Sequence, residues 1–416
     1  MRPYLGVFQL LSWYQLLLLF SLVGVLVTPV SGWQEQAAAS ALPRYPAKSD
    51  PLTQSGFAHY YDLDYDRAVR DFERVLKSYP DDPFAINHLV EAMLFRELYR
   101  AGVLDTGLYA GNAFLRKRVV NIAPEVQTRL QQLALRSVEL CDKRIREDPK
   151  DAGAYYARGV SKGLRSAYTA FVERSWFAAL KTAKSARKDH EEVLELDPSY
   201  ADAKLVVGIH DYIVGSLPWA ARVLAHVVGE GGSKTRGLKE LQEAGDGGGE
   251  AAVDAKVVLG LFLRREQRYA EALAVGAALR QAHPRNFLFA VETASVLKDW
   301  GKGPDSIAAY RAVLASAREG KYLNPHLEFA YWGLGEALRG QRDYEGAVEA
   351  YDTVQALPIA DADLVLHSNL AAGQMFDVLN RRAQAIKKYE AVLAASSDSE
   401  QASLARRLLK QPYRQN

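Results

Sequence analysis

Residues 331–358 read YWGLGEALRGQRDYEGAVEAYDTVQALP, and this stretch decides the fold. Gly335 is followed by Ala347 and Tyr351 at offsets of 12 and 16, and Pro358 ends the run. The alanine and the aromatic residue, four positions apart, lie on one face of a helix. Proline cannot continue that helix, so it closes the unit. The stretch therefore predicts two antiparallel helices joined by a short polar turn.

The same spacing recurs at three other places along the chain. The matching positions are Gly56, Ala68, Phe72 and Pro80; Gly260, Ala272, Gly276 and Pro284; and Gly373, Ala385 and Tyr389. We expect each first glycine to let the second helix of its pair approach closely. A pair of amphipathic helices cannot bury both of its faces alone, so neighbouring pairs must stack. We predict an all-α, right-handed superhelical solenoid of antiparallel helix pairs over residues 55–416.

At these positions the sequence resembles the tetratricopeptide repeat family. Gly56, Ala68, Phe72 and Pro80 fall where the signature residues of that family lie, and residues 331–335 are similar to its Trp-to-Leu-Gly opening. The resemblance implies a concave groove, lined by the first helix of each pair, that contacts extended peptides. It does not imply any particular partner.

Two stretches interrupt the period, at residues 97–124 and 205–250. Both are rich in glycine and are predicted to be irregular insertions, which are often functional. In the second, residues 208–212, 216–218 and 237–241 resemble eukaryotic tetratricopeptide proteins that include the mitochondrial inclusion-body clearance protein. That resemblance implies only a protein-interaction role.

Residues 1–32 are predicted to be a signal peptide or a membrane anchor. Residues 4–32 carry no charged side chain, follow the positive Arg2 and end in small residues, which is typical of an export signal. The apolar part, residues 4–30, is also long enough to remain as an anchor, and a buried core helix is the third alternative. Residues 33–54, rich in Ala, Ser and Pro, are predicted to be a flexible linker. An export segment indicates a bacterial chain that is periplasmic or secreted, or anchored in the inner membrane and facing the periplasm.

Composition argues against several functional classes. The chain has 52 Lys and Arg against 50 Asp and Glu, for a net charge of +2, which is unfavourable for a nucleic-acid binder. Its single cysteine, Cys141, cannot form a disulfide framework or a cysteine-based zinc site. We expect that thiol to be a small buried side chain.

No motif for catalysis, metal binding or cofactor binding is complete. Residues 62–73 place acidic side chains at calcium-loop spacing, but Arg67 occupies the position that needs glycine. Residues 229–235 depart from a phosphate-binding loop, and the histidines lack zinc-hydrolase spacing. We therefore predict no enzyme activity, no metal and no cofactor. A hydrolase with a site not visible in sequence stays an alternative, with His210 and Asp211 as its first candidates.

Matching positions by the repeat offset predicts which residues line the concave face. They are Tyr60, Tyr61, Arg264, Arg265, Trp332, Glu336, Arg339, Gln374 and Asp377. Aromatic and Arg side chains often anchor interfaces. For the aromatic members the alternative is packing between helices. The paired Lys and Asn with which some family members clamp a carboxyl terminus are missing, so no clamp of that kind is expected.

Together these observations predict a non-enzymatic scaffold of the bacterial cell envelope that binds a peptide or protein in a concave groove. The alternative is an accessory subunit that grips a lipid or glycan in a pocket near Trp219. Membrane association is possible through residues 4–30, and the oligomeric state is not predicted.

Overall fold

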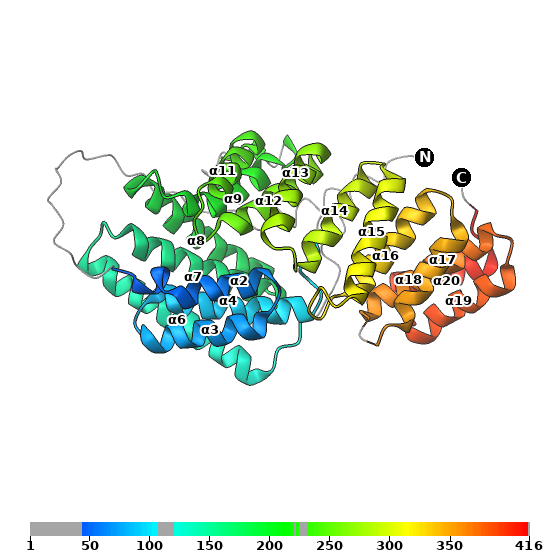
Figure 1. Cartoon of the computed structure of the whole chain (residues 1–416), viewed down its shortest axis with the longest axis horizontal. Coiled ribbons are helices and arrows are strands. Elements are labelled where there is room, and N and C mark those ends of the chain that lie inside the picture. The colour runs from blue at the N-terminus through cyan, green and yellow to red at the C-terminus, as the bar shows by residue number, and fades with distance from the viewer. Residues whose placement is uncertain (1–43, 107–119, 220–221, 224–230, 359, 415–416) are drawn as a thin grey trace. The chain divides into compact units, whose positions relative to one another are not determined.

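In the computed structural model, most of the described chain is helical (Figure 1). The described residues are 44–106, 120–219, 222–223, 231–358 and 360–414. They contain 17 α-helices and no strand, so the predicted all-α fold of stacked helices is confirmed. No helix in these ranges is long and apolar enough to cross a bilayer. The predicted signal or anchor, residues 1–32, lies outside the described residues.

The chain divides into two compact units. Unit 1 comprises residues 1–103 and 112–262, and unit 2 comprises residues 104–111 and 263–416. The described elements of unit 1 are the 3-10 helices η1 (Pro46–Ser49) and η2 (Ala201–Ala203) and the α-helices α2 (Pro51–Tyr61), α3 (Tyr65–Ser78), α4 (Pro83–Arg100), α6 (Pro124–Glu147), α7 (Ala152–Phe171), α8 (Trp176–Leu196), α9 (Lys204–Gly215), α11 (Lys234–Asp246) and most of α12 (Ala252–Arg265). Within this unit, helices that are neighbours in the chain pack against each other.

Unit 2 repeats this arrangement with shorter helices (Figure 1). They are α13 (Tyr269–Ala282), α14 (Phe287–Asp299), α15 (Gly303–Arg318), α16 (Leu327–Gly340), α17 (Tyr344–Ala356), α18 (Ala362–Val378), α19 (Arg382–Ala395) and α20 (Glu400–Lys410). Each packs against the next. The last one, α20, buries Ala402 and Ala405 and exposes Arg406, Arg407 and Lys410. It is therefore amphipathic, with one apolar buried side and one charged exposed side.

Glycine-to-ring contacts hold the helix pairs together. A Cβ atom added at any of three glycines of the repeat would lie 2.5 Å from a ring carbon on the second helix. The pairs are Gly56 with Phe72, Gly335 with Tyr351, and Gly373 with Tyr389. Only a residue without a side chain allows this distance, which confirms the predicted role of these glycines.

The turn within each helix pair contains a residue in the left-handed conformation. Leu63, Gln267, Arg342 and Asn380 have φ values of 64°, 58°, 62° and 59°. Each follows the first glycine of its repeat by seven positions. A fifth residue, Gly301, has φ of 78° in the turn between α14 and α15. Four of these five residues are not glycine, so closure of the helix pair imposes a conformation that their side chains disfavour.

Residues 44–54, which were predicted to belong to the flexible linker, are part of the folded body. The rest of the predicted linker, residues 33–43, lies outside the described residues. η1 and α2 occupy most of residues 44–54, and Ala47 is fully buried. The Tyr45 hydroxyl donates to Asp151 at 2.7 Å, and the Ala47 amide donates to Asp82 at 3.1 Å. These carboxylates also cap α7 and α4, so one short segment ties several helix starts together.

The predicted insertion at residues 205–250 is largely a further helix pair. α9 and α11 pack against each other, and Gly208 and Gly237 allow their backbones to approach. The first predicted insertion also begins in a helix, since α4 continues to Arg100. Residues 107–119, 220–221 and 224–230 lie outside the described part of the chain.

Candidate functional site

Three of the predicted groove residues meet in unit 2. Glu336 and Arg339 come from α16 and Asp377 from α18, the first helices of two successive pairs. Arg339 Nη1 lies 3.5 Å from Glu336 Oε1. Both Arg339 and Asp377 contact Tyr413, which follows the terminal helix α20. We call Glu336, Arg339 and Asp377 the Asp377 site.

Asp377 is the centre of the site and is only 8% exposed. It accepts hydrogen bonds from the Tyr389 hydroxyl at 2.8 Å and from Arg382 Nη1 at 2.9 Å. The main-chain N–H of Tyr413 donates to the same carboxylate at 2.8 Å. Burial, together with the hydrogen bond to Asp377, raises the pKa of Tyr389 above its usual value. The buried carboxylate of Asp377 thus accepts hydrogen bonds from a hydroxyl, a guanidinium and a main-chain N–H at the same time.

Arg382 connects this carboxylate to the terminal helix. Its Nη2 donates to the carbonyl oxygens of Leu408 and Leu409, both at 2.7 Å. These carbonyls belong to the last turn of α20, where no intrahelical donor is available. Arg382 thus holds the end of α20 in place. The residues that follow this end bring Tyr413 to Asp377.

The other groove candidates of unit 2 differ in exposure. Trp332 is partly buried, and its ring lies 5.3 Å from the ring of Tyr351 and 6.1 Å from that of His367. It packs between helices, as the alternative interpretation allowed. Gln374, one turn before Asp377 on α18, is partly exposed and borders the site.

Arg264 is a structural residue rather than a groove residue. It is 5% exposed, and its guanidinium lies 2.9 Å from Glu292 and 2.6 Å from Asp299. Two carboxylates of α14 therefore hold it inside the unit. Its neighbour Arg265 is partly exposed at the end of α12.

Tyr60 and Tyr61 are covered by the chain itself, which corrects their prediction as partner contacts. They are 3% and 7% exposed. The Tyr60 hydroxyl lies 3.4 Å from Glu91 Oε1, and the Tyr61 hydroxyl donates to Asp254 Oδ2 at 3.0 Å. Asp254 lies in the first turn of α12, so this helix packs over the C-terminal end of α2, where Tyr60 and Tyr61 lie. Repeat spacing predicts a face of α2 but not the distant helix that buries it.

Two carboxyl groups lie close together in this covered part of unit 1. Burial raises the pKa of Asp254 to about 6. Burial and the nearby Asp254 charge also raise the pKa of Glu91 well above its usual value. Both groups bind a proton more tightly in the folded than in the unfolded chain. The Asp254 charge therefore destabilises the fold as pH rises from about 4 through 6, and its full penalty remains above that range.

Replacing Asp254 with asparagine is expected to stabilise unit 1 at pH 7.5 by about 1–2 kcal/mol. An amide removes the buried charge and still accepts the Tyr61 hydroxyl. At pH 4, where the native carboxyl is protonated, the stability difference should vanish. Urea unfolding at both pH values checks this, with E390Q on the exposed surface of α19 as the control. A gain that is the same at both pH values would contradict the electrostatic explanation.

Comparison with known families was made by sequence and by structure. Residues 52–82 and 292–362 each match a family model of the tetratricopeptide repeat. These two segments of the chain are therefore tetratricopeptide repeats. No curated protein matches this repeat protein in sequence.

Solved structures with similar helix stacking have low sequence identity to this repeat protein. Yeast Tom70 has 11% identity and a TM-score of 0.41, with 87% of this chain and 88% of that chain covered. The human IFIT1 dimer with m7Gppp-AAAA has 11% identity and a TM-score of 0.42, covering 89% and 88%. A tetratricopeptide repeat protein from Parabacteroides merdae has 12% identity and a TM-score of 0.34, covering 78% and 99%. At these values no ligand or partner is transferred to this chain.

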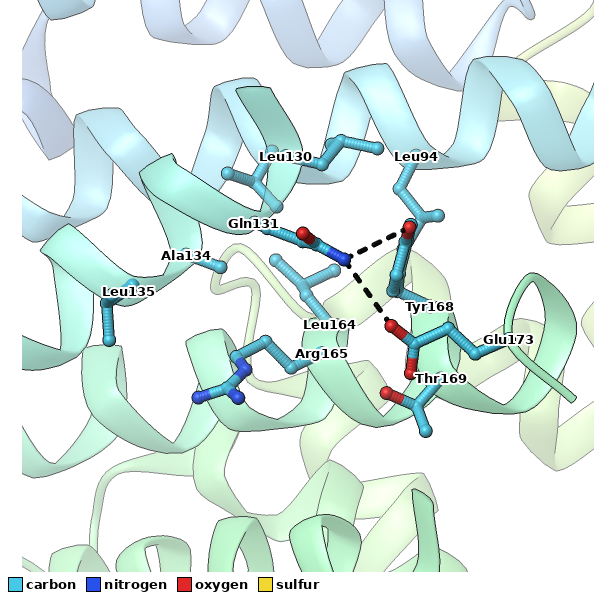
Figure 2. A pocket seen from close by; sticks show the side chains of 11 residues that line it. Leu94, Leu130, Gln131, Ala134, Leu135, Leu164, Arg165, Tyr168, Thr169 and Glu173 are labelled. Atoms are coloured by element: carbon cyan, nitrogen blue, oxygen red, sulfur yellow. Dashed lines mark hydrogen bonds between the residues drawn. The ribbon is translucent and has the colours of Figure 1, made fainter. Parts of the chain in front are cut away.

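A pocket of the repeat protein lies between α4, α6 and α7 (Figure 2). This pocket of about 230 Å³ has apolar walls that include Leu94, Leu130 and Leu164. On its polar side the Gln131 amide lies within 3.4 Å of Tyr168 and Glu173. Its volume is below the range of about 300–1,000 Å³ typical of small-ligand pockets and suits one apolar side chain. Sequence analysis did not find it, because these helices lack the repeat signature.

The residues proposed for a hidden hydrolase form part of an ion-pair network. His210 and Asp211 are buried in α9. Arg187 Nη1 lies 3.2 Å from His210 Nε2, and Arg236 pairs with Asp211. Burial acts to raise the pKa of Asp211, but the nearby His210 ring and the hydrogen bond from Arg236 bring it below its usual value. Arg187 belongs to α8, His210 and Asp211 to α9, and Arg236 to α11. The charged Asp211 is therefore part of a structural link between these three helices.

The lipid or glycan alternative depended on Trp219. This side chain is 74% exposed. Most of the residues that follow it, 220–221 and 224–230, lie outside the described part of the chain. A pocket around Trp219 therefore stays a prediction. In the described ranges, no group of three or more His, Cys, Asp or Glu side chains could hold a metal ion.

Proposed function

We propose that this repeat protein is a non-enzymatic scaffold that holds an extended protein segment at the Asp377 site. Tetratricopeptide repeats generally mediate protein–protein interaction, and two parts of this chain match such repeats. One observation carries the proposal: a non-helical stretch of the chain, at Tyr413, already donates its main-chain N–H to the Asp377 side chain. The site thus accepts the backbone of a segment that comes from outside the helix pairs.

The chemistry of the site suits recognition of a peptide rather than catalysis. A main-chain N–H is present in almost every residue, so Asp377 provides affinity that does not depend on sequence. Arg339 is partly buried and lies near the Tyr413 side chain, so it favours a segment with an acceptor at this position. Glu336 accepts the Tyr351 hydroxyl and thereby fixes its own position beside Arg339.

We also propose that the scaffold acts in the cell envelope of a bacterium. Support for this comes from the sequence of residues 4–32, with its uncharged apolar run behind Arg2. Two of the three alternatives for this segment, a cleaved signal and a retained anchor, would place unit 2 on the outer side of the inner membrane. The partner is then a protein or peptide of that compartment.

A photocrosslinking amino acid at Gln374 is expected to capture a defined protein partner in intact cells. Gln374 borders the site and is partly exposed, so its replacement leaves the buried carboxylate in place. The same amino acid at Glu390, exposed on the second helix of the pair, is the matched control. Adducts specific to position 374 that contain an envelope protein support both proposals. Equal adducts at the two positions contradict the site, and an exclusively cytoplasmic partner contradicts the location.

A further inference from the structure

We infer that the C-terminal segment Gln411–Arg414 is a displaceable occupant of the Asp377 site, and that the partner segment carries the same chemistry. This inference rests on the proposed function, since it assumes that the site binds an extended segment. The chain would then regulate its own binding face, and a partner must compete with a ligand that is part of the same molecule.

The segment is attached to the site by few contacts. Gln411, Pro412 and Arg414 are exposed, and only Tyr413 is partly buried. Its main-chain N–H donates to Asp377, and its side chain lies near enough to Arg339 to interact with the guanidinium. One hydrogen bond and one partly buried ring hold a segment that is otherwise in solvent, so a competitor with the same groups can replace it.

The site beneath the segment is complete without it. Asp377 keeps its bonds from Arg382 and Tyr389, and Arg382 keeps the carbonyl oxygens at the end of α20. Removal of Tyr413 therefore leaves a carboxylate that can accept one more hydrogen bond. It does not leave a buried carboxylate without partners. The N-terminal segment near Ala47 differs, because there the chain is fully buried and belongs to the core.

Pro412 explains why the segment arrives in an extended form. A proline disfavours the helical conformation in the residue before it. Gln411 has φ of −135° and ψ of 119°, which is extended backbone, and α20 ends there. The segment is thus preorganised to present the next N–H, that of Tyr413, to Asp377. The matching ligand is an extended segment in which a tyrosine follows a proline.

The test compares the full chain with a chain that ends at Gln411. A fluorescent peptide of residues 410–416 is titrated into each, and binding is followed by anisotropy. A tethered segment competes at an effective concentration on the order of millimolar. We therefore expect the shortened chain to bind the peptide at least about tenfold more tightly than the full chain.

Peptide variants and one protein variant identify the contacts. Replacing the tyrosine of the peptide with phenylalanine removes the hydroxyl that interacts with Arg339 and should weaken binding several-fold, and alanine should weaken it further. R339M in the shortened chain should reproduce the phenylalanine effect, whereas K387M on the exposed surface of α19 should not. Equal weakening by R339M of the tyrosine and phenylalanine peptides would contradict the assigned contact.

Three outcomes would overturn the inference. One is no peptide binding by a shortened chain whose amide hydrogen exchange in α16–α19 is unchanged. Another is equal binding by both chains. The third is a concentration-dependent dimer of the full chain that is lost on shortening, which would show exchange of the segment between two copies. If crosslinks at Gln374 persist while the peptide fails, the proposed function stands and only this inference falls.

Discussion

Replacing Gly56 with alanine is expected to destabilise the α2–α3 pair by about 2–3 kcal/mol. The added methyl group would lie 2.5, 2.7 and 2.9 Å from three ring carbons of Phe72. Phe72 is itself buried, so its ring cannot move away without opening a contact elsewhere. Because a repeat contacts mainly its neighbours, the loss should appear first as faster hydrogen exchange in α2 and α3.

The control is an alanine at Gly163, in the middle of α7. No atom lies within 4 Å of a Cβ added there. This substitution should stabilise its helix by roughly 0.5–1 kcal/mol, since alanine is the better helix former. The double variant G56A/F72L should lose less stability than the sum of the two single changes, because leucine makes room for the methyl group. Strict additivity would show that the ring contact is not the cause.

Replacing Arg264 with methionine is expected to destabilise unit 2 by about 3 kcal/mol at pH 7.5. The guanidinium is 5% exposed and serves both Glu292 and Asp299, so its loss leaves Glu292 without this cation and Asp299 with only Lys298, 3.5 Å away. Burial already raises the pKa of Glu292, while Arg264 lowers it. Without Arg264 that pKa rises further, so the folded variant binds a proton more tightly than the unfolded chain. The deficit should therefore shrink as pH falls to about 5.

Urea unfolding at pH 5 and pH 7.5 measures this effect. R268M is the matched control, because Arg268 and Glu271 form an exposed ion pair at 2.6 Å. Its removal should change stability by less than about 1 kcal/mol. The double variant R264M/E292Q should recover part of the loss by removing the carboxylate of Glu292. An Arg264 effect as small as that of Arg268 would contradict the buried network.

Most of the fold could be predicted from short-range patterns. The Gly-to-Ala offset of 12 located four helix pairs, and the buried positions Ala68, Ala347 and Ala385 lie where that offset places them. Helix periodicity is a local property, so it can be recognised within a stretch of about twenty residues. The pair formed by α9 and α11 was missed, because its close approach uses glycines at a different spacing.

The candidate site was predicted only in part. Spacing placed Glu336, Arg339 and Asp377 on the inner side of their helices, and the structure brings them together. The same spacing suggested Tyr60 and Tyr61, which the structure buries. A repeat offset identifies a face of a helix, but exposure of that face depends on chain segments far away in sequence.

The sequence by itself determined the helix pairs and the glycine contacts at Gly56, Gly335 and Gly373, because each follows from side chains within one repeat. The tertiary structure alone decided three other features. It placed Leu63, Gln267, Arg342 and Asn380 in left-handed turns, since closure of each pair outweighs their local preference. It covered Tyr61 with Asp254, 193 residues later. Finally, the tertiary structure placed Tyr413 in contact with Asp377, because contacts between distant segments depend on how all the helices between them stack.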